Sequence, residues 1–163
     1  MRPLSEREIR TAFVNCSKGE ASRLGLPRNL AEQPWPDLDY LGWRDPRAPE
    51  RAYLVTELAD GVKGIALRYP TPTTRRLRRS MCSICVTSPV GGVALMVAPK
   101  AGPAGRQGNT VGTYLCSDLS CSLYVRGKKD PGVGGRLHES LTLEEKIQRT
   151  VSNLTAFITT VGA

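Results

Sequence analysis

Histidine is almost absent from this sequence, and His138 is the only one in 163 residues. Neither a Ser/His/Asp triad nor a pair of carboxylates placed for acid–base chemistry can be assembled from its motifs. The glycine-rich segment GKKDPGVGG lacks the strand–GxxxxGK[ST]–helix context of a phosphate-binding loop. We therefore expect a binding protein and not an enzyme.

Long apolar runs are also absent. The longest, VALMVA, is too short to cross a bilayer, and the N-terminal stretch MRPLSEREIRTAF lacks the apolar centre of a secretory signal. We expect a cytoplasmic protein, monomeric and without a membrane partner. In that reducing compartment structural disulfides are disfavoured, so a tight cysteine cluster points to metal binding or catalysis.

What the chain does contain is typical of one folded domain. Hydrophobic residues make up 40% of it and charged residues 23%, and its length allows a real hydrophobic core. The formal net charge is +8. Such a balance favours an acidic partner surface, which nucleic acid, a ribonucleoprotein or an acidic protein could all provide.

Helices are predicted at both ends of the chain. Ser5 and Glu8 form a capping box, which predicts a first helix over about residues 6–17. Cys16 lies on the apolar stripe of that helix, so we expect it to be buried and not a metal ligand. A second capping box at Thr142 and Glu145 starts a long C-terminal helix. Its expected core face consists of Leu143, Ile147, Val151, Leu154 and Ile158.

Between the helices the sequence predicts β-structure. RAYLVTE and GVKGIALRY read as a hairpin around an Asp60-Gly61 turn. GGVALMVAP and TVGTYLCS read as two further strands with the flexible KAGPAGRQGN between them. The fold class is therefore α+β, with antiparallel β-hairpins and N- and C-terminal helices. We expect an N-terminal helix and linker over residues 1–36 and a main domain over 37–163.

The cysteines suggest a metal site. Cys82 and Cys85 form a CxxC pair, and Cys116 and Cys121 follow about thirty residues later. Zinc needs four deprotonated donors in tetrahedral array, and a CxxC turn supplies two of them. The second pair can come from a strand end and the first turn of a helix, which predicts a treble-clef zinc finger at about residues 80–127. Such a closed site is structural, with no open position to activate water.

Two other interpretations of the cysteines stay open. A redox dithiol needs a CxxC at a helix start, but VTSPVGG after Cys85 cannot open a helix. Alternatively the cysteines bind nothing. His138 could replace a ligand, although four cysteines suffice and a loop histidine is the simpler interpretation.

Four arginines, Arg75, Arg76, Arg78 and Arg79, directly precede the CxxC pair. Together with Arg126 they could partly neutralise the net charge of −2 on a tetrathiolate zinc site. They could also contact phosphates or acidic side chains of a partner. Both roles are compatible, because alternate residues of an extended chain face opposite ways.

The motifs LGWRDP, MCSICV and GNTVGTYLCSDLSCSLYVRG resemble the zinc-binding C-terminal domain of elongation factor G-binding proteins, a family that includes the fusidic acid resistance proteins. The similarity runs from about Leu38 to the C-terminal helix. It implies that Cys82, Cys85, Cys116 and Cys121 hold a treble-clef zinc ion. It also implies a non-enzymatic protein that binds elongation factor G and helps it leave the ribosome. Tyr114 and Arg106 are the counterparts of the aromatic and basic contacts to the factor.

A second hypothesis remains beside this one. The RRLRR and RGKK segments are basic, and they could bind phosphates of RNA or of the ribosome without a protein partner.

Overall fold

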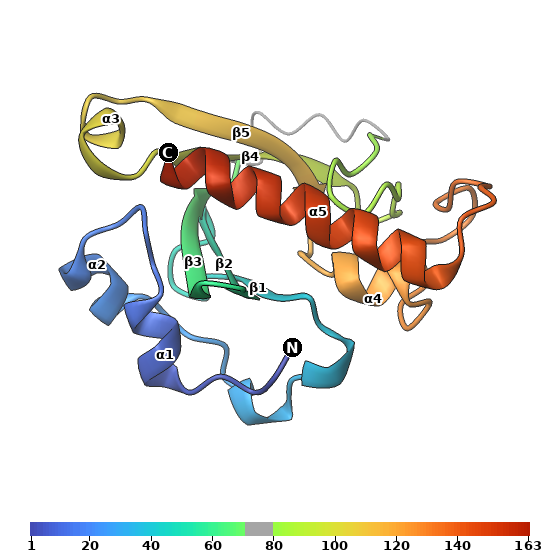
Figure 1. Cartoon of the computed structure of the whole chain (residues 1–163), viewed down its shortest axis with the longest axis horizontal. Coiled ribbons are helices and arrows are strands. Elements are labelled where there is room, and N and C mark those ends of the chain that lie inside the picture. Colours follow the sequence, from blue (N-terminus) through green and yellow to red (C-terminus); the bar gives the residue numbers. More distant parts are fainter. Residues whose placement is uncertain (71–79) are drawn as a thin grey trace.

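The computed structural model describes residues 1–70 and 80–163. Its centre is a five-stranded antiparallel sheet in the order β1-β2-β3-β4-β5 (Figure 1). The strands are β1 (Tyr40–Arg44), β2 (Arg51–Leu58), β3 (Gly61–Arg68), β4 (Val93–Pro99) and β5 (Thr110–Cys116). The α-helices are α1 (Glu6–Thr11), α2 (Lys18–Arg23), α3 (Gly102–Arg106), α4 (Cys121–Val125) and α5 (Leu143–Gly162). Two short 3-10 helices, η1 (Leu30–Glu32) and η2 (Trp35–Asp37), precede the sheet. The predicted α+β class with antiparallel hairpins is confirmed.

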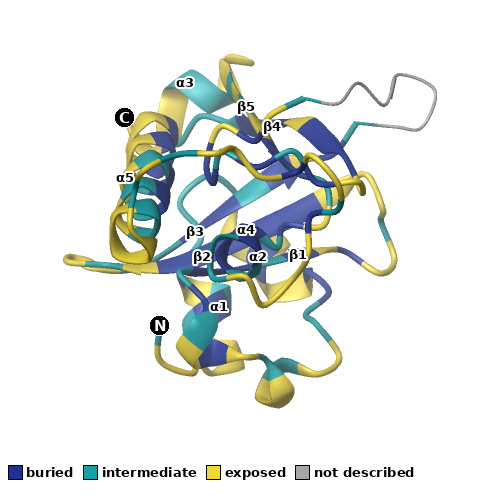
Figure 2. Cartoon of the chain, turned by 90° about the vertical axis from the view of Figure 1, so that its right-hand side faces the viewer, coloured by how far each residue is buried: buried dark blue, intermediate teal, exposed yellow. Residues whose placement is uncertain are grey.

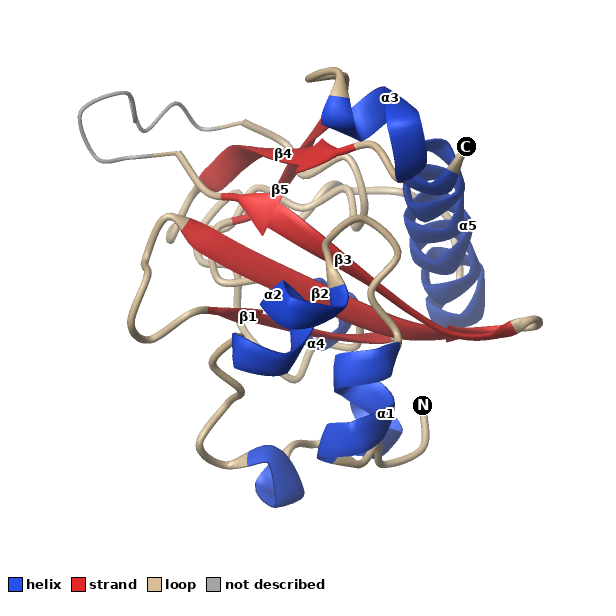
Figure 3. Ribbon diagram, turned by 90° about the vertical axis from the view of Figure 1, so that its left-hand side faces the viewer, coloured by secondary structure: helices blue, strands red, loops and turns tan. Residues whose placement is uncertain are grey.

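The sheet consists of two parts joined at one corner. β2 and β3 pair along their whole length around the predicted Asp60-Gly61 turn, where Gly61 has a φ of 118°. β4 and β5 pair from Val93 to Pro99, and α3 lies in the loop predicted to be flexible. β3 and β4, however, pair only at Arg68 and Val97. The two hairpins therefore separate from this corner, and the first half of β3 has backbone groups that β4 does not satisfy (Figure 3).

The N-terminal segment pairs with that free edge, and the predicted helix over residues 6–17 is wrong beyond Thr11. The amide of Val14 donates to the carbonyl of Gly64 at 2.9 Å, and the amide of Gly64 donates to the carbonyl of Ala12 at 2.9 Å. The helix ends because these backbone groups bond to β3 instead of to the preceding helical turn. A separate helix, α2, begins after Ser17 with its own capping box, so Cys16 lies half-buried between two helices.

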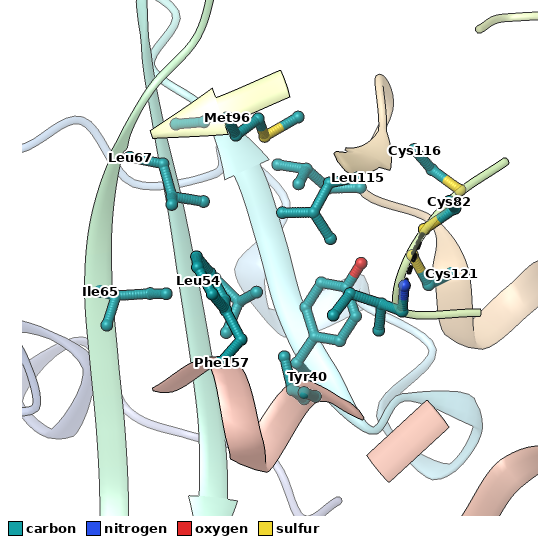
Figure 4. Packing of buried hydrophobic residues seen from close by; sticks show 14 of the residues in the cluster. Tyr40, Leu54, Ile65, Leu67, Cys82, Met96, Leu115, Cys116, Cys121 and Phe157 are labelled. Atoms are coloured by element: carbon teal, nitrogen blue, oxygen red, sulfur yellow. Dashed lines mark hydrogen bonds between the residues drawn. The ribbon is translucent and has the colours of Figure 1, made fainter. Parts of the chain in front are cut away.

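The core has two clusters, one on each face of the β2–β3 hairpin. In the first, α5 contacts β3, β5 and α4. This cluster includes Leu54, Ile65, Met96 and four cysteines, Cys82, Cys85, Cys116 and Cys121, and Figure 4 labels all of these except Cys85. The second contains Trp35, Trp43 and the N-terminal helices.

The long C-terminal helix buries one face, as Figure 2 shows. Leu154, Phe157, Ile158 and Val161 are buried on it. Leu143, expected in the core, is 52% exposed, because α5 meets the sheet only along its C-terminal half. No helix in the described part of the chain is long and apolar enough to span a membrane.

Candidate metal centre

The four cysteines of the two predicted pairs lie together in the first core cluster. The Sγ atoms of Cys82 and Cys121 are 3.6 Å apart, and those of Cys85 and Cys116 are 3.5 Å apart. All four sulfurs lie within 4.8 Å of one another, and all four residues are buried. A tetrahedral site with metal–sulfur bonds of about 2.3 Å has sulfurs about 3.8 Å apart. The cluster therefore has the size of a four-thiolate metal site.

The first pair comes from a tight knuckle. The amide of Cys82 donates to the carbonyl of Thr87 at 2.8 Å, and the amide of Val86 donates to the carbonyl of Cys82 at 3.0 Å. Val86 has a φ of 58°, which bends the chain back on itself. Inside the turn, the amide of Ile84 donates to the sulfur of Cys82 at 3.4 Å. The knuckle thus turns both sulfurs inward and supplies a donor to one of them.

The second pair comes from a strand end and a helix start, as the sequence predicted. Cys116 is the last residue of β5, where it pairs with Val93, and Cys121 is the first residue of α4. The amide of Leu119 donates to the carbonyl of Cys116 at 2.8 Å, and Leu119 has a φ of 57°. This turn brings Cys121 back beside Cys116.

Contacts to β1 and to Asp39, the residue before it, hold α4 in place. Arg126, at the end of α4, forms an ion pair with Asp39 through two hydrogen bonds of 2.7 Å. Gly42 of β1 lies against the turn before α4, where an added Cβ would come within 2.7 Å of the Cβ of Leu119. The prediction that Arg126 neutralises the thiolates is corrected by this geometry, because both terminal nitrogens of its guanidinium are bonded to Asp39.

Two buried hydroxyls face the sulfurs. The Oγ1 atom of Thr87 is 3.0 Å from the sulfur of Cys85 and 3.8 Å from that of Cys116. The hydroxyl of Tyr40 is buried without a hydrogen-bond partner among the described residues and points toward the sulfur cluster (Figure 4). Burial, and next the charge of Cys121, raise the pKa of Tyr40 well above its usual value, so the hydroxyl keeps its proton. Both groups can donate to thiolates, which is what a tetrathiolate metal site requires.

Acid–base chemistry also favours a bound cation. Hydrogen bonds from Cys116 and Cys121 lower the pKa of Cys82. Hydrogen bonds with Cys116 and Cys82 raise the pKa of Cys121. Without a metal, ionisation of one of these cysteines therefore opposes ionisation of the others, so the four thiolates cannot readily coexist. A bound dication removes the repulsion between neighbouring thiolates, because its charge favours the thiolate form of all four ligands. Four sulfurs in tetrahedral array suit zinc or iron.

Of the predicted partner-binding residues, the structure describes two, Tyr114 and Arg106. Arg75, Arg76, Arg78 and Arg79 lie outside the described residues. Tyr114 is 46% exposed on β5, two residues before Cys116. Arg106 is exposed at the end of α3, beyond the other end of the hairpin. Arg106 thus precedes the start of β5, whereas Tyr114 lies near its end, about 13 Å along the strand from Thr110. His138 is exposed in the segment before α5.

Thr87 and Leu95 were not identified from the sequence. Leu95 lies directly opposite Tyr114 in the β4–β5 pairing and is 45% exposed. Alternation of side chains along the strand could have identified Leu95 as exposed. The run VALMVA is continuously apolar, however, which is typical of a strand buried on both faces. Thr87 carried no signal beyond standing two residues after Cys85.

Fold and site together define the class: an α+β domain built around a treble-clef metal site, in which a knuckle, a hairpin and a helix start supply four cysteines. A family model described as the FBP C-terminal treble-clef zinc-finger matches residues 8–161. The chain therefore belongs to this family, which confirms the resemblance found in the sequence. The match begins well before Leu38, and so includes most of the N-terminal segment that pairs with β3. No curated protein matches the chain.

Proposed function

We propose that Cys82, Cys85, Cys116 and Cys121 bind one structural zinc ion. The support is the closed set of four buried sulfurs in a family of zinc fingers. Elemental analysis of protein purified without chelator tests the proposal, and we expect one zinc per chain. Stoichiometric iron, or no metal, would contradict it.

We further propose that this domain is a non-enzymatic binding protein for elongation factor G and promotes release of the factor from the ribosome. The observation that carries the proposal is a set of exposed apolar side chains, which we call the hairpin patch: Leu95 and Tyr114 on neighbouring strands, and Met81 directly before Cys82 of the knuckle. Each of these side chains is between 45% and 46% exposed. Tyr114 and Leu95 are cross-strand partners, so their side chains stand next to each other on one face.

The backbone that carries the hairpin patch is bonded to the cysteine knuckle. The amide of Ser83, inside the knuckle, donates to the carbonyl of Tyr114 at 2.8 Å. Cys116 lies two residues further along the same strand. The patch therefore stands on backbone that a bound metal holds rigid. A rigid, exposed aromatic side chain is a common anchor at protein interfaces, because little conformational entropy is lost when it is buried.

The charge of the chain suits the proposed partner. A net charge of +8 favours encounter with the acidic surfaces that elongation factor G and the ribosome offer. Charges at the rim of an interface mainly set the rate of encounter, whereas buried apolar contacts hold the complex. We expect binding to weaken moderately with salt and to survive nuclease treatment.

Calorimetry of the metal-loaded protein with purified elongation factor G tests the role of the patch. We expect Tyr114→Ala to weaken binding by about tenfold or more, as removal of an interface anchor does. Leu143→Ala is the matched control, because Leu143 is 52% exposed but lies at the start of α5, and we expect it to leave the affinity unchanged. Release is then measured as the loss of factor from sedimented ribosomes.

Absence of heat at tens of micromolar would contradict binding to the factor, and equal affinities of the two variants would exclude the hairpin patch. Clear binding to an RNA oligonucleotide, with a steep decrease of affinity as salt rises, would favour the RNA-binding hypothesis instead.

A further inference from the structure

A cleft of about 420 Å³ lies between α2, the N-terminal segment and the β2–β3 hairpin. Figure 3 shows α2 over this part of the sheet. None of the four clustered cysteines lines the cleft. Its charged lining comprises three arginines and two carboxylates: Arg23, Arg51, Arg68, Glu20 and Asp45. Its volume lies within the range of about 300–1,000 Å³ that is usual for small-molecule sites.

Two of the arginines face each other across the sheet. Arg51, the first residue of β2, is the register partner of Arg68, the last residue of β3. Directly opposite residues of an antiparallel pair project from the same face with their Cβ atoms about 5 Å apart, and like charges in such a pair are destabilising. The register therefore places two like charges side by side, and a bound anion would relieve their repulsion.

No carboxylate in the described part of the chain forms an ion pair with Arg23, Arg51 or Arg68. Elsewhere, arginines such as Arg10 and Arg149 do pair with carboxylates. Arg23 and Arg51 both lower the pKa of Glu20, although less than its contacts with Ser17 do. The guanidinium groups therefore lie near one carboxylate without bonding to it.

The carboxylates of the cleft are bonded to its walls. Oε2 of Glu20 accepts hydrogen bonds from the amide of Ser17 at 2.8 Å and from its hydroxyl at 2.7 Å. The carboxylate of Asp45 accepts from the amides of Gly25 and Arg47 at 3.2 and 2.9 Å, and from the hydroxyl of Tyr53 at 3.2 Å. The acidic groups thus hold the loops together, whereas none of the three guanidinium groups forms an ion pair with a carboxylate within residues 1–70 and 80–163.

We propose that this cleft binds the phosphate group of a small soluble ligand, either a phosphate monoester or a diphosphate. A dianion between Arg51 and Arg68 removes their repulsion, and each planar guanidinium can donate two hydrogen bonds to phosphate oxygens. Arg23 approaches from α2 and supplies a third cation. The three arginines are exposed at the cleft, whose volume of about 420 Å³ suits a small ligand. The backbone of a long nucleic acid instead requires an extended basic surface. This site is separate from the hairpin patch, so its test does not depend on the proposed function.

Calorimetry of the metal-loaded full chain with inorganic pyrophosphate, at constant ionic strength, tests the proposal. We expect one pyrophosphate per chain. Arg68→Gln should weaken binding by about tenfold or more, as loss of a charge-assisted contact to a phosphate does. Arg28→Gln is the matched control, because Arg28 is exposed and does not line the cleft, and we expect it to leave the affinity unchanged.

Thermal unfolding gives a second measurement, in which we expect Arg68→Gln to stabilise the protein although it weakens ligand binding. Without ligand, Arg68→Gln should raise Tm by about 1–3 °C, since it removes a like-charged cross-strand pair. Pyrophosphate should raise the Tm of the wild type but not that of Arg68→Gln. Three results would overturn the proposal: no pyrophosphate binding in the millimolar range, equal weakening by Arg68→Gln and Arg28→Gln, or displacement of pyrophosphate by an RNA oligonucleotide that binds more tightly.

Discussion

Thr87 places a hydroxyl between two of the clustered sulfurs, and its role can be tested by a change that keeps its shape. Thr87→Val removes the donor that lies 3.0 Å from the sulfur of Cys85. We expect the affinity for zinc to fall by about tenfold or more, because groups that hydrogen-bond to metal ligands stabilise the thiolate form. Competition with a chromogenic chelator measures the affinity.

Thr159→Val is the control for that measurement, because Thr159 is exposed on α5 far along the chain from the knuckle. If both variants retain zinc as well as the wild type does, the Thr87 hydroxyl has no part in metal binding.

Cys16 should react slowly with thiol reagents. Burial, and next the charge of Glu20, raise the pKa of its thiol to about 11 from an ordinary 9.0. Only the thiolate is nucleophilic, so at pH 8 the reactive fraction is about a hundredfold smaller than for an ordinary thiol. We expect the metal-loaded protein to show no rapidly modified cysteine with Ellman's reagent, and a rate that rises about tenfold per pH unit up to pH 9.5. Rapid modification of Cys16 at neutral pH would contradict this expectation.

At the scale of elements, one side chain joins the N-terminal segment to both halves of the sheet. The amide nitrogen of Asn15 donates to the carbonyls of Ala66 in β3 and Pro99 in β4, each at 2.9 Å. Its oxygen accepts from the amide of Ala66 at 2.8 Å. These contacts lie where the two hairpins separate, so Asn15 connects strands that hardly pair with each other.

Asn15→Asp should therefore destabilise the fold. The substitution keeps the size of the side chain but replaces the donor with an oxygen that faces two carbonyls. We expect a loss of about 2 kcal/mol in the free energy of unfolding, the usual cost of leaving partly buried polar groups unpaired. Urea titration of the metal-loaded protein measures it. Asn29→Asp, at an exposed position before η1, should change stability little. Equal stability of the two variants would show that Asn15 does not join the sheet halves.

At the scale of the whole molecule, the metal site is expected to stabilise the first core cluster. A structural zinc site contributes an apparent free energy of about 10–16 kcal/mol, comparable with the total stability of a domain, about 5–15 kcal/mol. Cys116→Ser should therefore abolish hydrogen-exchange protection around Leu115 and Tyr124, which lie in that cluster. Cys16→Ser removes the one cysteine outside the site and should leave this protection intact.

Tryptophan fluorescence offers an independent view, because both tryptophans, Trp35 and Trp43, lie in the second core cluster. On removal of the metal by a chelator, we expect protection in the first cluster to be lost before tryptophan emission changes.

A Cys116→Ser protein that melts like the wild type would show that the metal does not stabilise the fold.

Features that depend on neighbours in the sequence were predictable without a structure. The capping boxes at Ser5 and Thr142 involve residues three apart, and both are present. The CxxC knuckle and the turn from Cys116 to Cys121 are likewise local. The spacing of the four cysteines, together with the resemblance to a zinc-binding family, predicted a treble-clef arrangement, and the four sulfurs do lie together.

Other features depend on which strands become neighbours, and only the tertiary structure decided them. The first helix ends at Thr11 because β4 leaves half of β3 unpaired, a consequence of strand geometry that no local propensity contains. Arg51 and Arg68 are seventeen positions apart in the chain, and only the register of the hairpin sets them face to face. The same holds for Leu95 and Tyr114. Local chemistry thus determined the metal site, whereas long-range pairing of backbone groups created the cleft and the exposed patch.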